Sequence, residues 1–192
     1  VTAEFAVSDP GETRNPRNLS HTPGGSSSGS AASVAAGFCD IAIGTQTSGS
    51  VIRPAGYCGT IGYKPSFGRI SRDGVLLFSN SMDHIGICAK DLNLLEKTLP
   101  LLVNSWSFWK PKINRNISIG VPVGSYMNLS KPAILHQFFN TVQLLKAKFH
   151  VNKFELVKDI NRYNRKIDDI SSAELYKVHA VWYERYKELY GP

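Results

Sequence analysis

Two blocks of serine and glycine within an almost uncharged stretch constrain the fold of this chain most strongly. The first block, residues 24–31, has the sequence GGSSSGSA, and the second, residues 45–54, has the sequence TQTSGSVIRP. Across residues 24–63 only two side chains, Asp40 and Arg53, carry a charge. Side chains this small suit close approach of backbone segments, so we expect tight packing around the first block.

The first block taken alone has the composition of a flexible spacer. Its serines, however, run without a break into residues 31–38, an apolar and alanine-rich segment with helical propensity. A spacer in that position has nothing to separate. The second block follows a short apolar run and forms a turn of threonine, serine and glycine. Together the two blocks are interpreted as two halves of one active site.

The composition is that of an ordinary globular protein, with 42% hydrophobic and 19% charged residues in a chain of 192. One domain is the default at this length. The net charge is +7, and lysine and arginine gather in residues 110–115 and 158–187, in the second of which acidic residues are mixed with them. Because no recognition motif accompanies these residues, we interpret them as solvated helix faces and expect no nucleic-acid partner.

The sequence contains no signal peptide and no long apolar run, so we expect a cytoplasmic protein without membrane contact. Three cysteines in apolar contexts, with no CxxC pair, fit packed thiols in a reducing compartment: Cys39, Cys58 and Cys88. Three histidines lack the spacing of metal ligands: His136, His150 and His179. We expect no metal and no cofactor.

Apolar periodicity and turn residues predict alternating elements after a loop over residues 11–23. Helices are predicted over residues 27–38, 91–103, 132–148 and 171–189, the second with Asp91 as its N-cap. Strands are predicted over residues 40–44, 59–63, 117–121 and 154–157, the third closed by Pro122. The alternation predicts the fold class α/β, with a mixed β-sheet sandwiched by helices.

Ser50, in the second block, is the candidate nucleophile. A serine hydroxyl is a poor nucleophile until a neighbouring base takes its proton. The turn before Ser50 suits several backbone N–H groups aimed at one point, which is what a developing oxyanion needs. Neither residues 24–28 nor residues 49–52 fit the GxSxG elbow of α/β-hydrolases, because the closing glycine is missing at the required place. No GK[ST] follows a glycine-rich turn, which excludes a Walker-type phosphate loop.

Three ordered segments resemble the amidase signature family: GGSSSGSAASVAAG, GTQTSGSVIRPAGYCGTIGYKPSFGRIS and SNSMDHIG. The resemblance extends outward to VTAEFA and TRNPRNLSHTPGG, and to IGVPVGSY and AVWYERYKELYGP. It covers nearly the whole chain and is weakest over residues 100–116 and 149–170. It implies one partial amidase signature domain over residues 1–192, with core motifs in residues 20–90 and a helix and strand continuation in residues 91–192.

The resemblance implies a Ser–cis-Ser–Lys triad. Ser50 matches the nucleophile, and Ser26 matches the bridging serine that follows a cis peptide bond. Backbone amides of four residues match the oxyanion hole: Thr47, Ser48, Gly49 and Ser50. Ser27 and Thr45 match supporting positions. Ser26 would relay the proton of Ser50 to a neutral lysine and later deliver it to the leaving nitrogen.

The implied reaction is hydrolysis of a small-molecule carboxamide through an acyl-enzyme. The products are a carboxylic acid and ammonia or an amine. The resemblance requires no cofactor, and we allow for a homodimer.

The sequence departs from the family pattern at three places. Ser48 replaces the first of two glycines before the nucleophile, which narrows the pocket. Gln46 stands where the A subunits of glutamine amidotransferases carry aspartate in GSDTGGSIRQ, which favours general amidases and biuret or allophanate-type hydrolases. The family's lysine lies several dozen residues before the bridging serine, and no lysine precedes Ser26 here. Lys64 matches a structural position and is no substitute, so we expect the isolated chain to be inactive and the base to lie outside it.

Two further side chains admit more than one interpretation. Arg53 would bind a substrate carboxylate or pair with Asp83, since a guanidinium in this setting needs a partner. His84 beside Asp83 suggests a His–Asp base, but the family motif uses neither as its base. Two alternatives to an amidohydrolase stay open: a catalytically inactive remnant that folds or binds partners, and, within the family, an amidotransferase A-type subunit.

Overall fold

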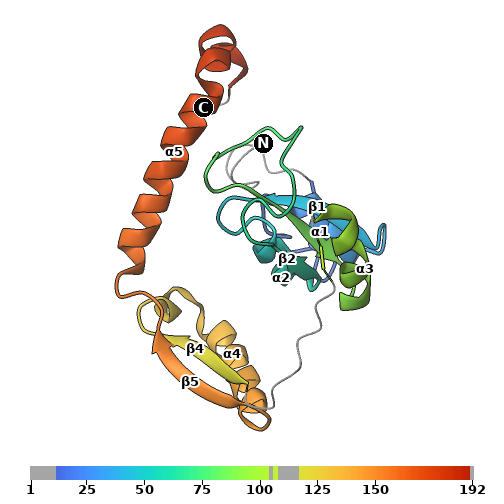
Figure 1. Cartoon of the computed structure of the whole chain (residues 1–192), viewed down its shortest axis with the longest axis vertical. Helices are drawn as coiled ribbons and strands as arrows, with labels where there is room; N and C mark the ends of the chain where they lie inside the picture. Colours follow the sequence, from blue (N-terminus) through green and yellow to red (C-terminus); the bar gives the residue numbers. More distant parts are fainter. Residues whose placement is uncertain (1–11, 104–105, 108–116, 191–192) are drawn as a thin grey trace. The chain divides into compact units, whose positions relative to one another are not determined.

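The computed structural model describes residues 12–103, 106–107 and 117–190. The chain divides into two compact units, one formed by residues 1–108 and 170–192 and the other by residues 109–169. Figure 1 shows the helices and strands in the order of the sequence. Among the described residues, no helix is both long and apolar enough to cross a membrane.

The first unit contains six elements before the connection to the second: α1 (Ser28–Ala35), β1 (Ile41–Gln46), α2 (Ile52–Cys58), β2 (Ile61–Tyr63), β3 (His84–Ala89) and α3 (Leu92–Leu102). The second unit contains β4 (Ser118–Val123), the 3-10 turn η1 (Met127–Leu129), α4 (Pro132–Lys146) and β5 (His150–Glu155). The last elements are α5 (Ile160–Arg185), which crosses the boundary between the units at residue 170, and the 3-10 turn η2 (Lys187–Leu189).

The sheet of the first unit has three antiparallel strands in the order β1-β3-β2. Strand β3 lies in the centre, and its residue Ile87 pairs with Ile43 on one side and with Tyr63 on the other. Neighbouring strands satisfy the backbone groups of β3 on both sides, and its side chains are buried over most of its length because residues pack against both of its faces.

Helices cover both faces of this sheet. Cys88 packs in one buried cluster with small residues of α1 and α2: Ala31, Ala32, Val34, Val51, Ala55 and Cys58. Successive side chains of a strand point to opposite faces. Ile87 accordingly packs in a second cluster with α3 and neighbouring segments: Ile70, Ile85, Ala89, Leu95, Leu99 and Val103. The predicted fold class α/β is confirmed, with helices on both sides of this sheet.

Two glycines show how tight the first cluster is. A Cβ added at Gly44 would lie 2.6 Å from Ser27 Oγ, and one added at Gly86 would lie 2.8 Å from Tyr63 O and 3.0 Å from Val51 Cγ2. Neither position has room for a side chain. The tight packing expected around the first serine block is therefore present.

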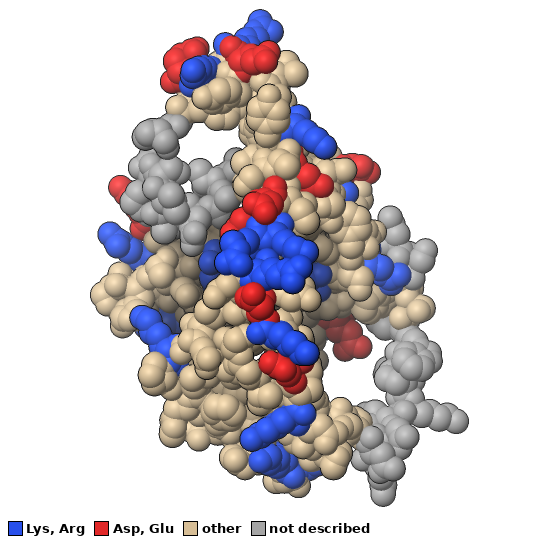
Figure 2. Space-filling view, turned by 90° about the vertical axis from the view of Figure 1, so that its left-hand side faces the viewer, with Lys and Arg blue, Asp and Glu red and all other residues tan. Residues whose placement is uncertain are grey.

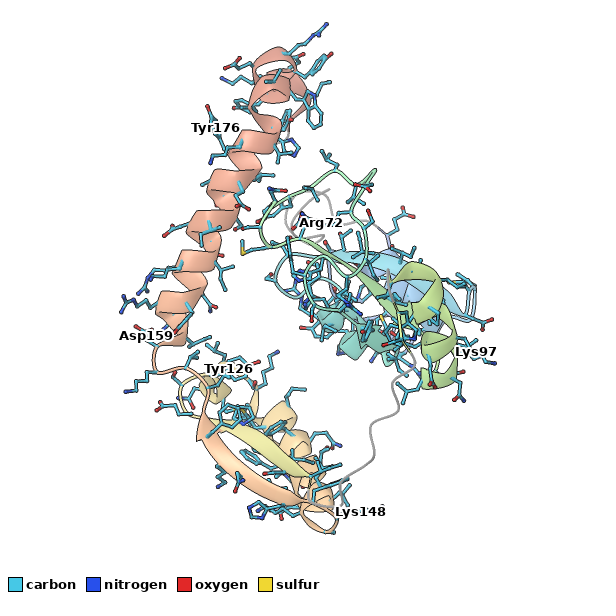
Figure 3. All side chains as sticks on the ribbon, in the orientation of Figure 1. Arg72, Lys97, Tyr126, Lys148, Asp159 and Tyr176 are labelled. Carbon is cyan, nitrogen blue, oxygen red and sulfur yellow. The ribbon has the colours of Figure 1, made fainter. Side chains whose placement is uncertain are left out.

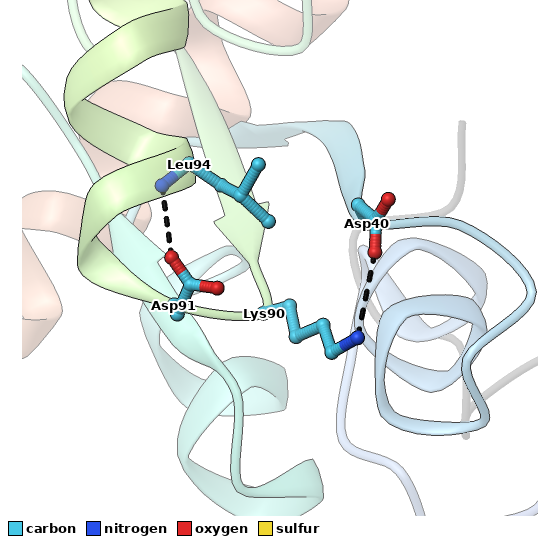
Figure 4. A network of polar contacts seen from close by, with 4 residues as sticks. All are labelled: Asp40, Lys90, Asp91 and Leu94. Atoms are coloured by element: carbon cyan, nitrogen blue, oxygen red, sulfur yellow. Dashed lines mark hydrogen bonds and ion pairs between the residues drawn. The ribbon is translucent and has the colours of Figure 1, made fainter.

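Helix α3 begins with the predicted cap, as Figure 4 shows. Asp91 is extended and its Oδ1 accepts a hydrogen bond of 2.9 Å from the N–H of Leu94. The adjacent Lys90 lies 3.7 Å from Asp40, and both side chains are mostly exposed. An ion pair in such solvent contributes little stability, so the cap matters more than the pair for where α3 starts.

The second unit is a parallel pair of strands joined through a helix. Ser118 of β4 pairs with His150 of β5, and the register continues to Val123 and Glu155. Parallel strands need a crossover connection, and α4 supplies it. It begins at Pro132, a residue suited to a first helical turn, and ends two residues before the predicted boundary. The strands of the described residues thus form two sheets, one antiparallel and one parallel.

Several predicted boundaries or elements differ from the structure, among them β5, which begins at His150 and not at residue 154. Strand β4 continues through Pro122, which is tolerated because an edge strand does not need every N–H for pairing. Strand β3 was not predicted, because a strand buried on both faces lacks alternation. Helix α2 was not predicted, because it is short and contains Pro54. Helix α5 starts at Ile160 and not at the predicted residue 171. Its first turns were missed because they are polar and exposed and show no apolar periodicity.

Candidate active site

The two serine blocks meet at a backbone hydrogen bond. Ser27 N–H donates to the carbonyl oxygen of Ser50 at 3.1 Å. The peptide bond between Gly25 and Ser26 is cis, as the resemblance predicts. Ser26 is half-buried and Ser50 is buried, with 7% of its surface exposed. The fold therefore brings the predicted bridging serine and the predicted nucleophile to neighbouring segments, and no hydrogen bond between their hydroxyls occurs in the described part of the chain.

Ser27 connects the first block to strand β1. Its Oγ donates to the carbonyl of Thr45 and accepts from the N–H of Thr45, both at 3.2 Å. Gly44 has no side chain at the position where Ser27 Oγ approaches the strand. The two residues predicted as supports thus contact each other directly, and their supporting role in a reaction stays a prediction.

The turn between β1 and α2 has backbone donors without an acceptor among the described residues. Within the described residues, none of the four N–H groups of the predicted oxyanion hole, residues 47–50, donates a hydrogen bond. The next two N–H groups are occupied, because Gln46 Oε1 accepts from Val51 at 2.9 Å and from Ile52 at 3.0 Å. Free N–H groups in a row suit an anion at this turn.

Asp83 anchors the turn to a second loop. Its Oδ1 accepts from the hydroxyl of Thr47, and its Oδ2 accepts from the N–H groups of Phe78 at 2.6 Å and Ser79 at 3.0 Å. Asp83 is buried, with 7% of its surface exposed. Buried carboxylates need such donors, so this loop and the turn hold one another.

Arg53 contacts the first block. Its Nε and Nη2 donate to the carbonyl oxygen of Gly25 at 3.2 Å and 2.8 Å. This carbonyl belongs to the cis peptide bond before Ser26. The sequence suggested a substrate carboxylate or Asp83 as the partner of Arg53, and both remain predictions beside this contact.

The other candidate bases, Lys64 and His84, form their described hydrogen bonds with groups other than Ser26 and Ser50. Lys64 Nζ donates to the carbonyl of Pro65 at 2.7 Å. His84 Nδ1 lies 2.6 Å from the carbonyl oxygen of Met82, and its ring packs edge-on against Phe67 at 5.4 Å between centroids. These contacts favour neither residue as the base for Ser50.

Several structural contacts were not predicted from the sequence. Asn15 is buried, and its Nδ2 donates to the carbonyls of Thr22 and Tyr57, which ties the loop before the first block to α2. Arg72 lies on the loop between β2 and β3 (Figure 3), and its Nη1 donates to the carbonyl of Asn80 at 2.7 Å. An asparagine in a turn-rich loop is a weak signal for such a role.

Glu174 of α5 is a further unpredicted residue. Its carboxylate accepts hydrogen bonds from Ser79 and Ser81, and the hydrogen bond from the Ser79 hydroxyl is the main reason that the pKa of this carboxyl is lowered. The partners are about ninety positions away in the sequence, so no local pattern indicates the contact.

The three thiols are packed to different degrees, and burial raises the pKa of Cys58 and Cys88. Cys58 and Cys88 are buried and Cys39 is half-buried, all without disulfides. Desolvation by burial raises the pKa of Cys88 to about 11, which leaves little thiolate at neutral pH. No group of three or more residues suited to a metal ion occurs among the residues the structure describes.

Charges are mixed on the surface. On the face drawn in Figure 2, lysine and arginine side chains lie among aspartate and glutamate. A nucleic-acid footprint instead gathers basic residues on one face. The view supports the interpretation of solvated helix faces on this side of the molecule.

Comparison with known proteins gives one family. The family model described as Amidase matches residues 2–181. The A subunit of the glutamyl-tRNA(Gln) amidotransferase of Brachyspira hyodysenteriae is 34% identical over 179 residues, which are 88% of this chain and 36% of that protein. The chain spans 22% to 36% of the length of three curated relatives that it matches.

Solved structures of amidases superpose on this chain. A crystal structure described as an amidase superposes with a TM-score of 0.83 and 27% identity, covering 95% of this chain and 42% of the other. The native peptide amidase of Stenotrophomonas maltophilia superposes with a TM-score of 0.69 and 28% identity, covering 90% of this chain and 39% of the other.

Proposed function

Because the chain belongs to the amidase family, we propose that it carries the nucleophile-bearing part of an enzyme that hydrolyses a carboxamide C–N bond. One observation carries this proposal: the hydrogen bond from Ser27 N–H to Ser50 O joins the block that contains Ser26 to the turn that contains Ser50. The two serines thereby lie in adjoining segments.

In the proposed reaction, Ser50 Oγ attacks the amide carbonyl carbon while Ser26 accepts the proton of Ser50 and passes its own proton to the neutral lysine of the triad. The oxygen that becomes negative is stabilised by the free N–H groups of residues 47–50. The C–N bond then breaks, and the proton returns through Ser26 to the leaving nitrogen, which departs as ammonia or an amine. Water hydrolyses the resulting ester of Ser50 and releases the carboxylic acid.

The third member of the triad is proposed to be a neutral lysine outside these 192 residues. Lys64 is not proposed for this role, because its ammonium group donates a hydrogen bond to the carbonyl of Pro65. The isolated chain should then release no appreciable ammonia from amides that the full-length protein hydrolyses. Robust hydrolysis by the isolated chain would overturn this part of the proposal.

A second candidate function is that of an amidotransferase A-type subunit, favoured by the identity to the A subunits of glutamyl-tRNA(Gln) amidotransferases. The substrate would then be the side-chain amide of glutamine, and the chain would act beside other subunits. Gln46, where these subunits carry aspartate, favours a free-standing amidase of linear amides. Comparing the turnover of glutamine with that of small aliphatic and aromatic amides separates the two candidate functions. The cytoplasmic location and the homodimer stay predictions.

The experiment is ammonia release by the full-length protein from a panel of such amides. Ser50→Ala should abolish the release, because it removes the hydroxyl that is proposed to attack the amide carbonyl. Ser71→Ala is a matched control, since Ser71 is exposed and bonds only with Asp73 in the described contacts. Turnover that survives Ser50→Ala unchanged would refute the nucleophile assignment.

A further inference from the structure

One carboxylate oxygen of helix α5 collects three hydrogen bonds from the loop that precedes β3. Glu174 Oε2 accepts from the hydroxyl of Ser79, and from both the N–H and the hydroxyl of Ser81 at 3.0 Å each. Ser79 is fully buried. A glutamate that only solvates a helix face has no need of such partners, so this contact fixes the loop against α5.

The same loop holds the turn of the candidate active site. The N–H of Ser79 donates to Asp83 Oδ2, and Asp83 Oδ1 accepts from the hydroxyl of Thr47. The hydroxyl of Ser79 therefore donates a hydrogen bond to Glu174, and its backbone N–H donates one to Asp83. Thr47 is the first of the four residues whose N–H groups donate no hydrogen bond to any residue that the structure describes.

We propose that Glu174 is a positioning residue for the turn of residues 47–50 and acts on it through Ser79 and Asp83. The proposal rests on the proposed function of that turn as the oxyanion site. Glu174 itself touches none of residues 47–50 in the described contacts. Its effect on the reaction passes through the placement of the Thr47 hydroxyl and, with it, of the backbone donors.

The first test measures the coupling without any activity. Hydrogen–deuterium exchange of the full 192-residue chain is followed in peptides that cover residues 78–83 and 47–52. Phe78 and Ser79 N–H groups bond to Asp83, and Val51 and Ile52 N–H groups bond to Gln46, so these amides report on the loop and on the turn. Glu174→Ala should speed exchange in both segments by about two- to thirty-fold.

Two further variants serve as controls for this exchange measurement. Glu174→Gln keeps an acceptor oxygen without the charge and should give a smaller acceleration in the same two segments. It decides the matter if Glu174→Ala unfolds the chain. Glu184→Ala removes the other glutamate between residues 170 and 185 of α5, which is exposed, and should leave both segments unchanged. Acceleration confined to residues 78–83, or absent from both segments, would overturn the proposal.

The second test uses the full-length protein. Glu174→Ala should lower kcat by about two- to thirty-fold with KM unchanged, since donors for the transition state are displaced while the rest of the substrate site is intact. Glu174→Gln should restore part of kcat. An effect on thermal stability alone, with kcat unchanged in the folded enzyme, would show a merely structural role and overturn the proposal.

The two tests separate this inference from the proposed function. If Ser50→Ala leaves turnover intact, the nucleophile assignment fails while the exchange measurement still judges the coupling. If Ser50→Ala abolishes turnover and Glu174→Ala changes neither exchange at residues 47–52 nor kcat, only the role of Glu174 fails.

Discussion

Replacing Gln46 with leucine should destabilise the turn that carries Ser50. Gln46 is 6% exposed, and its Oε1 accepts the N–H groups of Val51 and Ile52 at the start of α2. Leucine has a similar volume, so the change removes the acceptor and little packing. The N–H of Val51 is then buried without a partner, while the N–H of exposed Ile52 can turn to water.

One buried donor without a partner costs about 1–3 kcal/mol. For a chain of this size each kcal/mol lowers the midpoint of thermal unfolding by about 2–4 °C. Gln46→Leu should therefore lower the midpoint for the first unit by about 2–12 °C, measured by circular dichroism on the 192-residue chain. Gln46→Glu is the matched control, because its carboxylate keeps an acceptor for both N–H groups and should retain most of the stability. Equal midpoints for Gln46→Leu and the native chain would refute the reasoning.

Three further predictions concern packing, pH and thiol reactivity. Gly44→Ala should destabilise the first unit by about 1–3 kcal/mol in urea unfolding, because the new Cβ would lie 2.6 Å from Ser27 Oγ; a neutral effect would mean that the strand shifts freely. The hydrogen bond from Ser79 lowers the pKa of Glu174 below its ordinary value of 4.5. The ionised carboxylate therefore stabilises the folded chain above pH 4.5, and this contribution is lost as the pH falls through the lower pKa of the folded state. The difference in unfolding free energy between the native chain and Glu174→Gln should shrink over that fall in pH, and a constant difference would contradict the lowered pKa. Cys88, with a pKa of about 11, should resist iodoacetamide at pH 8 in the folded chain and react after unfolding in urea, as peptide mass spectrometry would detect; rapid labelling in the folded chain would contradict its burial.

The sequence predicts well those parts of the fold that are set by local chemistry. Asp91 caps α3 because an aspartate followed by apolar periodicity satisfies free N–H groups at a helix start. Pro132 begins α4 for a similar local reason. The pairing of the two serine blocks was also predicted, because their order and spacing match a family whose active site is built from both.

Long-range contacts were not predictable in this way. The carboxylate of Glu174 and the hydroxyl of Ser79 meet only because of how α5 and the loop pack, and neither neighbourhood in the sequence carries a signal of it. The central strand β3 was hidden for a different reason. It is buried on both faces, so its residues show no alternation of polar and apolar side chains from which a strand is inferred.

The contacts of Arg53 show a third limit. A guanidinium in an uncharged stretch indicates that a partner exists, and an acidic side chain or ligand is the usual expectation. In the structure, the backbone carbonyl of Gly25 accepts two of its hydrogen bonds. Backbone acceptors are present at every residue, so composition cannot distinguish one of them in advance.

In the proposed reaction, Ser50 forms the ester intermediate of amide cleavage. Its most direct measurement is peptide mapping by mass spectrometry of full-length protein that is quenched with acid while it turns over an amide. We expect the acyl group of the substrate on the peptide that contains Ser50, and we expect it to be missing in Ser50→Ala. An acyl group on another residue, or steady turnover with no acylated Ser50 at any quench time, would contradict it.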